Sequence, residues 1–170
     1  LVNITGVLNN AGITLDIGDA GVFSTGGLNS VSGTIVGGTI VSVDGRALVA
    51  TSTPYLDGVT LGNASNPNLS VNGGLFVKNG ITLANGITVN KGNDIWYFNT
   101  TGAQHIATPG TATILSSGGY LYAGYGVAGQ TLYLDSGITL QGYGAIYDSS
   151  VATVINAGTI HANTAGQTFL

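Results

Sequence analysis

Asn79-Gly-Ile-Thr-Leu-Ala-Asn-Gly-Ile-Thr-Val89 carries the pattern from which the fold of this chain is predicted. It contains one short unit twice, Gly80-Ile-Thr-Leu83 and Gly86-Ile-Thr-Val89, in which apolar residues flank a threonine. This period-two alternation is typical of a strand with one face on a core and the other on solvent. The glycine before each unit can adopt the positive φ that a tight corner requires. The segment therefore predicts short strands joined by tight corners.

The same unit recurs along the chain at a regular spacing. It appears again as Gly12-Ile-Thr-Leu15, Gly58-Val-Thr-Leu61 and Gly137-Ile-Thr-Leu140. Its apolar anchors are 22 residues apart from Ile13 to Ile35, from Val59 to Ile81 and from Ile138 to Ile160. Three short strands and three corners take roughly 20 to 27 residues, which is one coil of a parallel β-helix.

The repeat predicts an all-β fold, a right-handed parallel β-helix (β-solenoid) of about seven coils of roughly 22 residues each. A β-sandwich or an up-and-down barrel would also show frequent turn signals, but neither has a reason to repeat one strand motif at this spacing. No interior domain boundary is visible in the sequence. We therefore expect residues 1–170 to form a single β-solenoid module, a fragment or repeat unit of a longer chain or fibre.

The aromatic residues suggest two stacked rows with a similar period. The first predicted row is Tyr55, Phe76, Tyr97, Tyr120 and Tyr143. The second predicted row is Tyr125, Tyr147 and Phe169. In a solenoid, side chains one coil apart lie above one another, so each ring would pack on the ring of the next coil.

The composition fits such a fold and narrows the function. Charged residues make up 6% of the chain, against roughly 25% in typical soluble proteins. The only cations are Arg46, Lys78 and Lys91, so the chain lacks the basic stripe that nucleic-acid binding requires. The absence of cysteine excludes disulfides and thiolate-bound metals.

The run Val154-Ile-Asn-Ala-Gly-Thr-Ile-His-Ala-Asn163 resembles the Asn-x-Gly-x-Ile-x-Ala repeats of filamentous-haemagglutinin-like exoproteins and autotransporter passenger domains. The resemblance covers the repeat style over most of the chain, but the motif is degenerate. It implies a right-handed parallel β-helix on a bacterial cell surface, in an adhesin, a stalk or a matrix component. It also implies a secreted, extracellular location. No functional residue of those families carries over to this sequence.

Candidate catalytic and metal-ligating residues are few. Asp16 and Asp19 could form a small acidic rim for Ca²⁺, although two solvated turn carboxylates explain them better. His105 and His161 have no partner at metal-ligand spacing. Pectate-lyase-like enzymes share the β-helix fold but need carboxylate clusters together with basic residues, which are scarce here. We therefore expect no enzymatic activity, no catalytic residues, no metal and no cofactor.

Aromatic side chains supply the best candidate for a contact surface. The triplet Trp96-Tyr97-Phe98 must direct at least one ring outward if strand residues alternate between faces, and tyrosines concentrate in the last third of the chain. They are explained either by a sugar-stacking surface or by structural packing. The predicted contact patch consists of Trp96, Tyr97, Phe98, Tyr120, Tyr125, Tyr143 and Tyr147.

These observations favour a structural and adhesive extracellular rod, as a module of a bacterial surface exoprotein or filament. One alternative is a carbohydrate-binding solenoid that uses the tyrosine-rich face, and another is a polysaccharide lyase or hydrolase. Low charge and a lysine-poor surface permit head-to-tail or lateral self-association. Glycans and host or matrix surfaces are the other expected partners, whereas nucleic acid and membrane insertion are not expected.

Overall fold

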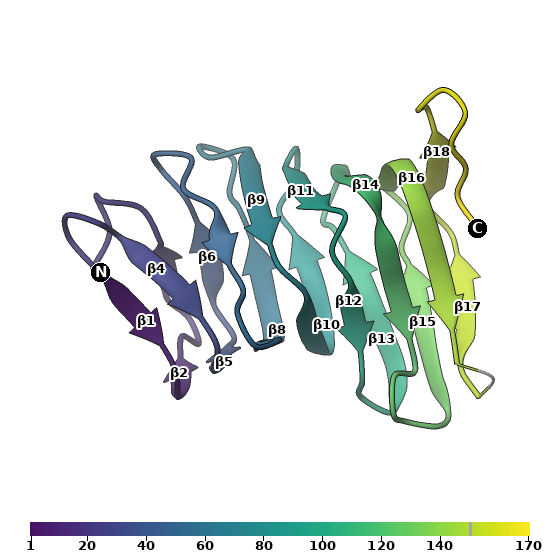
Figure 1. The fold of residues 1–170 in the computed structure, drawn as a ribbon, viewed down its shortest axis with the longest axis horizontal. Coiled ribbons are helices and arrows are strands. Elements are labelled where there is room, and N and C mark those ends of the chain that lie inside the picture. Colours follow the sequence, from purple (N-terminus) through teal and green to yellow (C-terminus); the bar gives the residue numbers. More distant parts are fainter. Residues whose placement is uncertain (150) are drawn as a thin grey trace.

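The computed structural model describes residues 1–149 and 151–170, and these form 18 strands and no helix. Every pairing between the strands is parallel. The coils stack on one another from one end of the molecule to the other, in the order of the chain (Figure 1). The result is a β-solenoid of about six turns, which confirms the predicted fold class.

The pairings form three columns of stacked strands, here called walls A, B and C. Wall A contains β1 (Val2–Ile4), β4 (Leu28–Val31), β7 (Leu48–Val49), β9 (Asn68–Asn72), β11 (Thr88–Gly92), the first halves of β14 (Ala112–Ala123) and β16 (Ile138–Asp148), and β18 (Thr159–Ala162). Wall B contains β2 (Val7–Asn9), β5 (Thr34–Val36), the first halves of β8 (Tyr55–Leu61) and β10 (Leu75–Leu83), β12 (Trp96–Phe98), and the second halves of β14 and β16. Wall C contains β3 (Thr14–Asp16), β6 (Thr39–Val41), the second halves of β8 and β10, β13 (Gly102–Ala107), β15 (Gln130–Leu134) and β17 (Thr153–Asn156).

The longest strands run around a corner from one wall to the next. β10 bends between walls B and C at Asn79 and Gly80, whose φ angles are +54° and +74°. β14 bends between walls A and B at Gly118 and Gly119, which also have positive φ. Left-handed backbone at these points lets the chain turn a corner while the strands on both sides keep their partners.

The interior of the solenoid is filled by the apolar residues of the alternating pattern, stacked coil upon coil. In wall A, Leu69, Val89 and Ile114 lie in register and are buried. In wall B, the large Phe98 is paired with the smaller Val77 on one side and Ala123 on the other. Large and small side chains thus pack on one another in adjacent coils, and burial of this apolar surface is the main stabilising contribution to the fold.

Buried polar side chains hold the corners between the walls. The Gln104 carboxamide oxygen accepts a hydrogen bond from the Gly80 N–H, at 2.7 Å, and the Gln130 Nε2 group donates to the Thr100 carbonyl, at 2.8 Å. Lys91 is buried, and its ammonium donates to the carbonyl of Gly118 at 2.9 Å. Corner backbone has no ladder partner, so these side chains satisfy polar groups that burial would otherwise leave unpaired.

The coils are less uniform than the sequence predicts. Paired residues are 21 positions apart between Leu56 and Val77, but 28 positions apart between Gln104 and Leu132. The longer coils carry extra residues in the connections between walls, where an insertion does not disturb strand pairing. The described residues therefore complete about six turns, close to the predicted seven.

The irregular coils also change the aromatic rows. Tyr55, Phe76 and Tyr97 are in register, as predicted. The row then continues through Tyr122 and Tyr147, so its predicted continuation through Tyr120 and Tyr143 is wrong. The second predicted row, Tyr125, Tyr147 and Phe169, is also wrong, because Phe169 bridges Gly144 and Tyr125 lies in a turn beyond the end of β14.

Candidate binding site: a tyrosine-lined cleft

A continuous row of aromatic rings runs along the outer face of wall B. The ring centroids are 4.8 Å apart for Tyr55 and Phe76, 5.1 Å for Phe76 and Tyr97, 5.9 Å for Tyr97 and Tyr122, and 4.8 Å for Tyr122 and Tyr147. The row exists because each of these residues occupies an outward position of a paired strand. Each ring is held by its neighbours in adjacent coils, so the row is a rigid surface.

Tyr125 reaches this row from outside the ladder. It follows the end of β14, and its N–H donates to the carbonyl of Phe98 at 3.1 Å. The flanking Gly124 and Gly126 both have positive φ, at +71° and +72°, which turns the chain back over the wall. The Tyr125 ring then packs 4.6 Å from Tyr97 and 5.2 Å from Tyr122.

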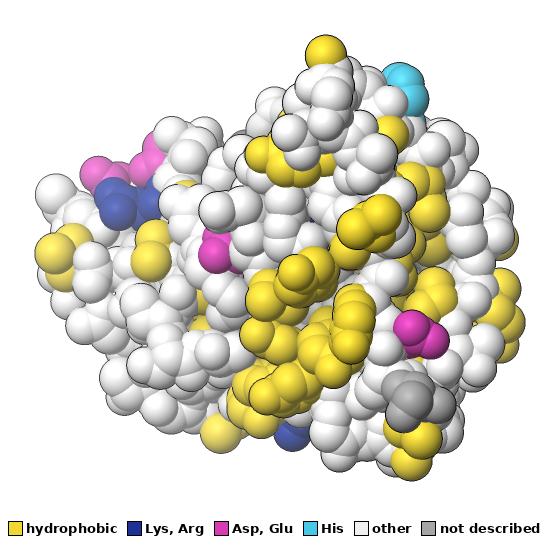
Figure 2. All heavy atoms as spheres, turned by 45° about the vertical axis from the view of Figure 1, so that its right-hand side comes forward, with side chains coloured by type: hydrophobic (Ala, Val, Ile, Leu, Met, Phe, Trp, Pro, Cys, Tyr) yellow, Lys and Arg dark blue, Asp and Glu magenta, His cyan; other side chains and the backbone are white. Residues whose placement is uncertain are grey.

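The rings line an open surface cleft of about 300 Å³. Its lining residues are Ile95, Tyr97, Tyr120, Tyr122, Tyr125 and Tyr147. The most exposed rings are those of Tyr120, Tyr125 and Tyr147, at 44%, 43% and 52%. A broad hydrophobic patch on this side of the molecule is visible in Figure 2. Contiguous exposed apolar surface of this kind marks a site of interaction more often than chance, particularly on a rigid scaffold.

The structure brings together four of the seven predicted patch residues and separates the other three. Tyr97, Tyr120, Tyr125 and Tyr147 line the cleft. Trp96 and Phe98 are fully buried, because they occupy the inward positions of β12, and this corrects the prediction that they belong to the patch. Tyr143 lies opposite Ser117, outside the cleft lining.

Two lining residues, Ile95 and Tyr122, are absent from the predicted contact patch, although Tyr122 is one of the tyrosines concentrated in the last third of the chain. Tyr122 has a signal that could have found it, because it alternates with the buried Leu121 and Ala123 and must therefore face outward. Ile95 precedes β12 and has no such signal, since residues outside strands follow no alternation.

The cleft is uncharged. None of its six lining residues carries a charged group. At the far end of the aromatic row, the Lys78 ammonium lies 4.3 Å from the centre of the Tyr55 ring. The site therefore presents ring faces and phenolic hydroxyls, without a fixed charge to attract an ionic ligand.

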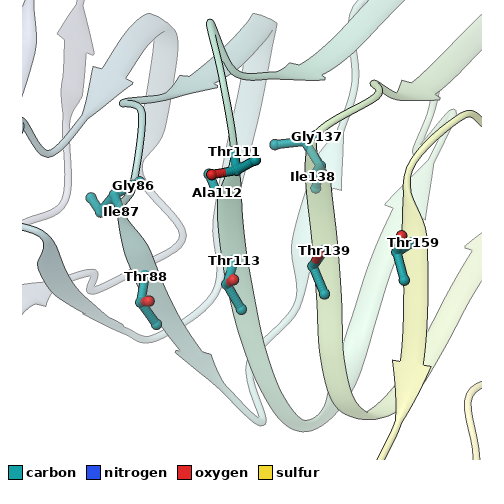
Figure 3. Close-up of a pocket in the computed structure, with 10 residues that line it drawn as sticks. All are labelled: Gly86, Ile87, Thr88, Thr111, Ala112, Thr113, Gly137, Ile138, Thr139 and Thr159. Atoms are coloured by element: carbon teal, nitrogen blue, oxygen red, sulfur yellow. The ribbon is translucent and has the colours of Figure 1, made fainter.

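A second groove of similar volume lies on wall A (Figure 3). Thr88, Thr113, Thr139 and Thr159 stack one above the other in successive coils and point to the same side. Gly86 and Gly137 also line this groove. It offers hydroxyl groups in a regular row but no aromatic face, so it provides fewer kinds of contact than the tyrosine-lined cleft.

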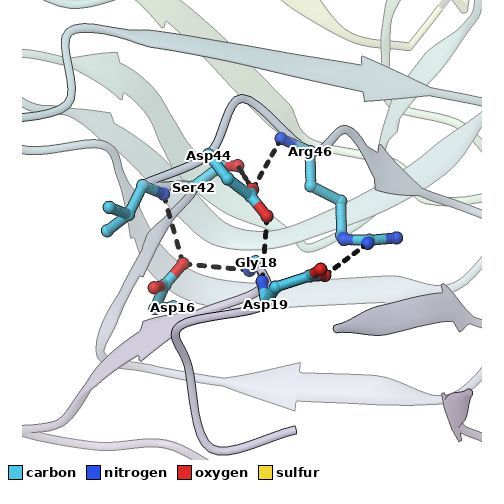
Figure 4. Close-up of polar contacts among 7 residues, drawn as sticks. Asp16, Gly18, Asp19, Ser42, Asp44 and Arg46 are labelled. Carbon is cyan, nitrogen blue, oxygen red and sulfur yellow. Dashed lines mark hydrogen bonds and ion pairs between the residues drawn. The ribbon is translucent and has the colours of Figure 1, made fainter. Parts of the chain in front are cut away.

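The acidic residues near the N-terminal end serve the turns of wall C (Figure 4). One Asp16 carboxylate oxygen accepts hydrogen bonds from the N–H groups of Gly18 and Val43, and Asp19 forms an ion pair with Arg46 at 2.6 Å. Asp44 accepts from the N–H groups of Asp19 and Arg46, and these bonds lower the pKa of its carboxyl group. These bonds tie two adjacent coils together, and no cluster of three or more potential metal ligands occurs among the described residues.

His105 has an acidic neighbour that the sequence does not reveal. Its Nδ1 atom lies 2.8 Å from an Asp135 carboxylate oxygen, 30 positions along the chain. Its ring also stacks on Tyr133 in the next coil, at 4.6 Å and an interplanar angle of 5°. The three side chains link adjacent coils of wall C at the surface, on a different wall from the aromatic row.

Comparison of the chain with protein-family models, with curated proteins and with solved structures finds no match. The structure itself supports a β-helix repeat architecture. No helix capable of spanning a membrane occurs among the described residues.

Proposed function

We propose that this chain is a structural and adhesive rod that works outside the cell, as a module of a bacterial surface exoprotein or filament. The observation that carries the proposal is the combination of a stiff ladder with an outward aromatic cleft. Three columns of parallel strands run along the solenoid, and wall B displays the cleft on its outer face. Rigid elements hold a contact surface better than loops do, and tyrosines are frequent at contact hot spots.

The extracellular assignment rests on the composition and on the repeat resemblance. Low charge and the absence of glutamate leave a surface of threonine, serine, asparagine and backbone. The resemblance to bacterial surface exoproteins implies an extracellular location. Labelling intact cells of the source organism with an antibody against this chain tests it. Surface-attached filaments that bind the antibody are the expected result, whereas labelling only after permeabilisation would contradict the proposal.

A bead assay tests the adhesive role. Beads that carry the chain are applied to immobilised polysaccharides, to matrix proteins and to whole cells, and the retained fraction is counted under flow. We expect retention on at least one surface, and its loss in the double variant Tyr125→Ala/Tyr147→Ala. A matched control is Tyr143→Ala, which removes a tyrosine outside the cleft. Retention that is unchanged in the double variant would mean that the cleft is not the adhesive site.

We further propose a non-catalytic role. The carboxylates of Asp16, Asp19 and Asp44 are engaged in turns and an ion pair, which supports a structural use of these groups. His105 and Asp135 are the closest approach to an acid–base pair, but the His105 ring is stacked on Tyr133. Assays for release of reducing or unsaturated sugar ends from polysaccharides test this, and turnover that disappears in His105→Ala would overturn it.

A further inference from the structure

We infer that the tyrosine-lined cleft binds an uncharged glycan, which stacks the apolar faces of its sugar rings on the tyrosines. The inference rests on the adhesive part of the proposed function and names the chemistry of its ligand. A sugar ring has C–H groups on its faces and hydroxyl groups around its edge. A matching site needs apolar ring surface with hydrogen-bonding groups at the rim, which is what a cluster of tyrosines provides.

The lining of the cleft distinguishes this ligand from an apolar protein segment. Five of the six lining residues are tyrosine, and the sixth is Ile95. A groove for an aliphatic helix would bury leucine or methionine contacts, and its lining would not need a hydroxyl on nearly every side chain. Each phenol carries a donor and an acceptor, so it can bond the edge of a sugar while the ring contacts the face.

The size of the cleft also favours a small or narrow ligand. A stable protein–protein interface buries about 800 Å² on each partner and involves about 20–30 residues a side. The cleft has six lining residues and a volume of about 300 Å³, near the lower limit for small-molecule sites. A short segment of a glycan fits this scale better than a folded partner does.

The absence of charged residues from the cleft lining distinguishes neutral glycans from acidic ones as ligands. No lining residue is charged, and two acidic residues adjoin lining residues along the chain, because Asp94 directly precedes Ile95 and the exposed Asp148 directly follows Tyr147. Lys78 lies at the opposite end of the aromatic row, against Tyr55, and is not part of the lining. An acidic polysaccharide would lose hydration of its carboxylates without gaining a cationic partner. The ligand class is therefore a neutral polysaccharide.

The rings are already in place before a ligand arrives. Tyr122 makes edge contacts with Tyr125 and with Tyr147, at interplanar angles of 72° and 85°. Because the planes of these tyrosine rings cross, the rings form the sides of the cleft, and packing between them fixes their positions. Because little side-chain freedom is lost on binding, even a small contact area can give measurable affinity.

To test this, the whole chain is titrated with cellohexaose, chitohexaose and mannohexaose, and binding is measured by isothermal titration calorimetry and by ligand-observed NMR. Hexagalacturonate serves as the charged comparison. We expect at least one neutral hexasaccharide to bind, with an affinity at least tenfold lower in Tyr125→Ala and in Tyr147→Ala. Tyr143→Ala, the matched control, should stay within twofold of the parent chain. Tyr120→Ala provides a third exposed position if either of the first two variants does not fold.

Three results would overturn the inference. The first is that none of the three neutral sugars binds, and the second is that hexagalacturonate binds more tightly than they do. The third is that sedimentation shows concentration-dependent dimers that Tyr125→Ala abolishes, which would mean that a second copy of the chain occupies the cleft. The bead assay distinguishes failure of the glycan-binding inference from failure of the proposed adhesive role. Adhesion that depends on Tyr125 and Tyr147 without neutral-glycan binding leaves the adhesive proposal intact and removes only the glycan.

Discussion

At the residue scale, the most informative side chain is the buried Lys91. Burial disfavours its charged form and lowers the pKa of its ammonium group to about 8, although nearby Asp94 acts in the opposite direction. The ammonium keeps two hydrogen bonds, to the carbonyls of Asp94 and Gly118. The Lys91 side chain thus joins two consecutive corners of the solenoid. Burial of its charged form costs free energy, and this cost depends on pH.

The pH dependence of stability should reveal this lysine. Between pH 8 and about pH 10.5 the unfolded chain binds more protons at residue 91 than the folded chain, so the free energy of unfolding rises with pH. We expect a gain of about 1–2 kcal/mol between pH 8.0 and 9.5, since one pKa unit corresponds to about 1.4 kcal/mol. Urea denaturation of the parent chain and of Lys91→Met measures it. Equal pH slopes in the two proteins would show that Lys91 does not titrate in this range.

At the element scale, β12 shows how alternation separates structural from exposed aromatic residues. Three consecutive aromatic residues occupy this strand, and their side chains alternate between the core and the outer face. Sequence reasoning placed at least one ring outside, and the structure identifies it as Tyr97. The strand itself could not show which neighbours Tyr97 meets, because these come from other coils.

Alanine substitutions in β12 should therefore differ sharply between adjacent positions. We expect Phe98→Ala to lower the free energy of unfolding by about 3–5 kcal/mol, since it leaves a cavity in the core. Tyr97→Ala should cost about 1 kcal/mol, because its ring is half-buried and lies on the outer face. Chemical denaturation measures both. Similar losses at the two positions would mean that the assigned faces of β12 are wrong.

Corner glycines are a second feature at the element scale. Gly12 and Gly38 have nearly the same φ, +74° and +69°, but different surroundings. A Cβ atom on Gly12 would meet nothing within 4 Å, whereas on Gly38 it would lie 2.0 Å from the Asn10 carbonyl oxygen. An alanine at Gly12 would therefore add backbone strain alone, whereas an alanine at Gly38 would add the same strain and a clash between two coils.

We expect Gly38→Ala to destabilise the fold by at least about 2 kcal/mol more than Gly12→Ala. Both variants carry the strain of a left-handed alanine, about 1–2 kcal/mol, but only the first forces two coils apart. Thermal and urea unfolding of the two proteins give the comparison. Equal losses would show that the coils can separate at Gly38 without cost.

At the scale of the whole molecule, a solenoid is a linear array in which each coil contacts only its neighbours. One coil can therefore be removed if the register is kept. Residues 56–76 form such a unit, because Leu56 and Val77 are paired positions one coil apart. After its deletion, Val77 would follow Tyr55 and take the place of Leu56 on β5.

We expect the chain without residues 56–76 to remain folded and monodisperse, with a parallel-strand circular dichroism spectrum and cooperative unfolding. Deletion of residues 56–66, about half a coil, should abolish folding, because it would move the following residues to the wrong wall. Size-exclusion chromatography and circular dichroism distinguish the outcomes. A folded half-coil deletion, or an unfolded whole-coil deletion, would be incompatible with stacking of equivalent coils.

The amino-acid sequence is sufficient to predict that the chain is all-β, that its strands have an apolar inner face, and that glycines mark its corners. These properties are local, since alternation and positive φ depend on a few neighbouring residues, as in Gly80-Ile-Thr-Leu83. In contrast, the identity of the residues that become neighbours between coils is seen only in the folded chain. Coil length is 21 residues from Leu56 to Val77 but 28 residues from Gln104 to Leu132, and extra residues at the corners change this length without disturbing the alternation within any strand. For this reason Tyr122 replaces Tyr120 in the aromatic row, and Tyr125 joins the cleft from a turn.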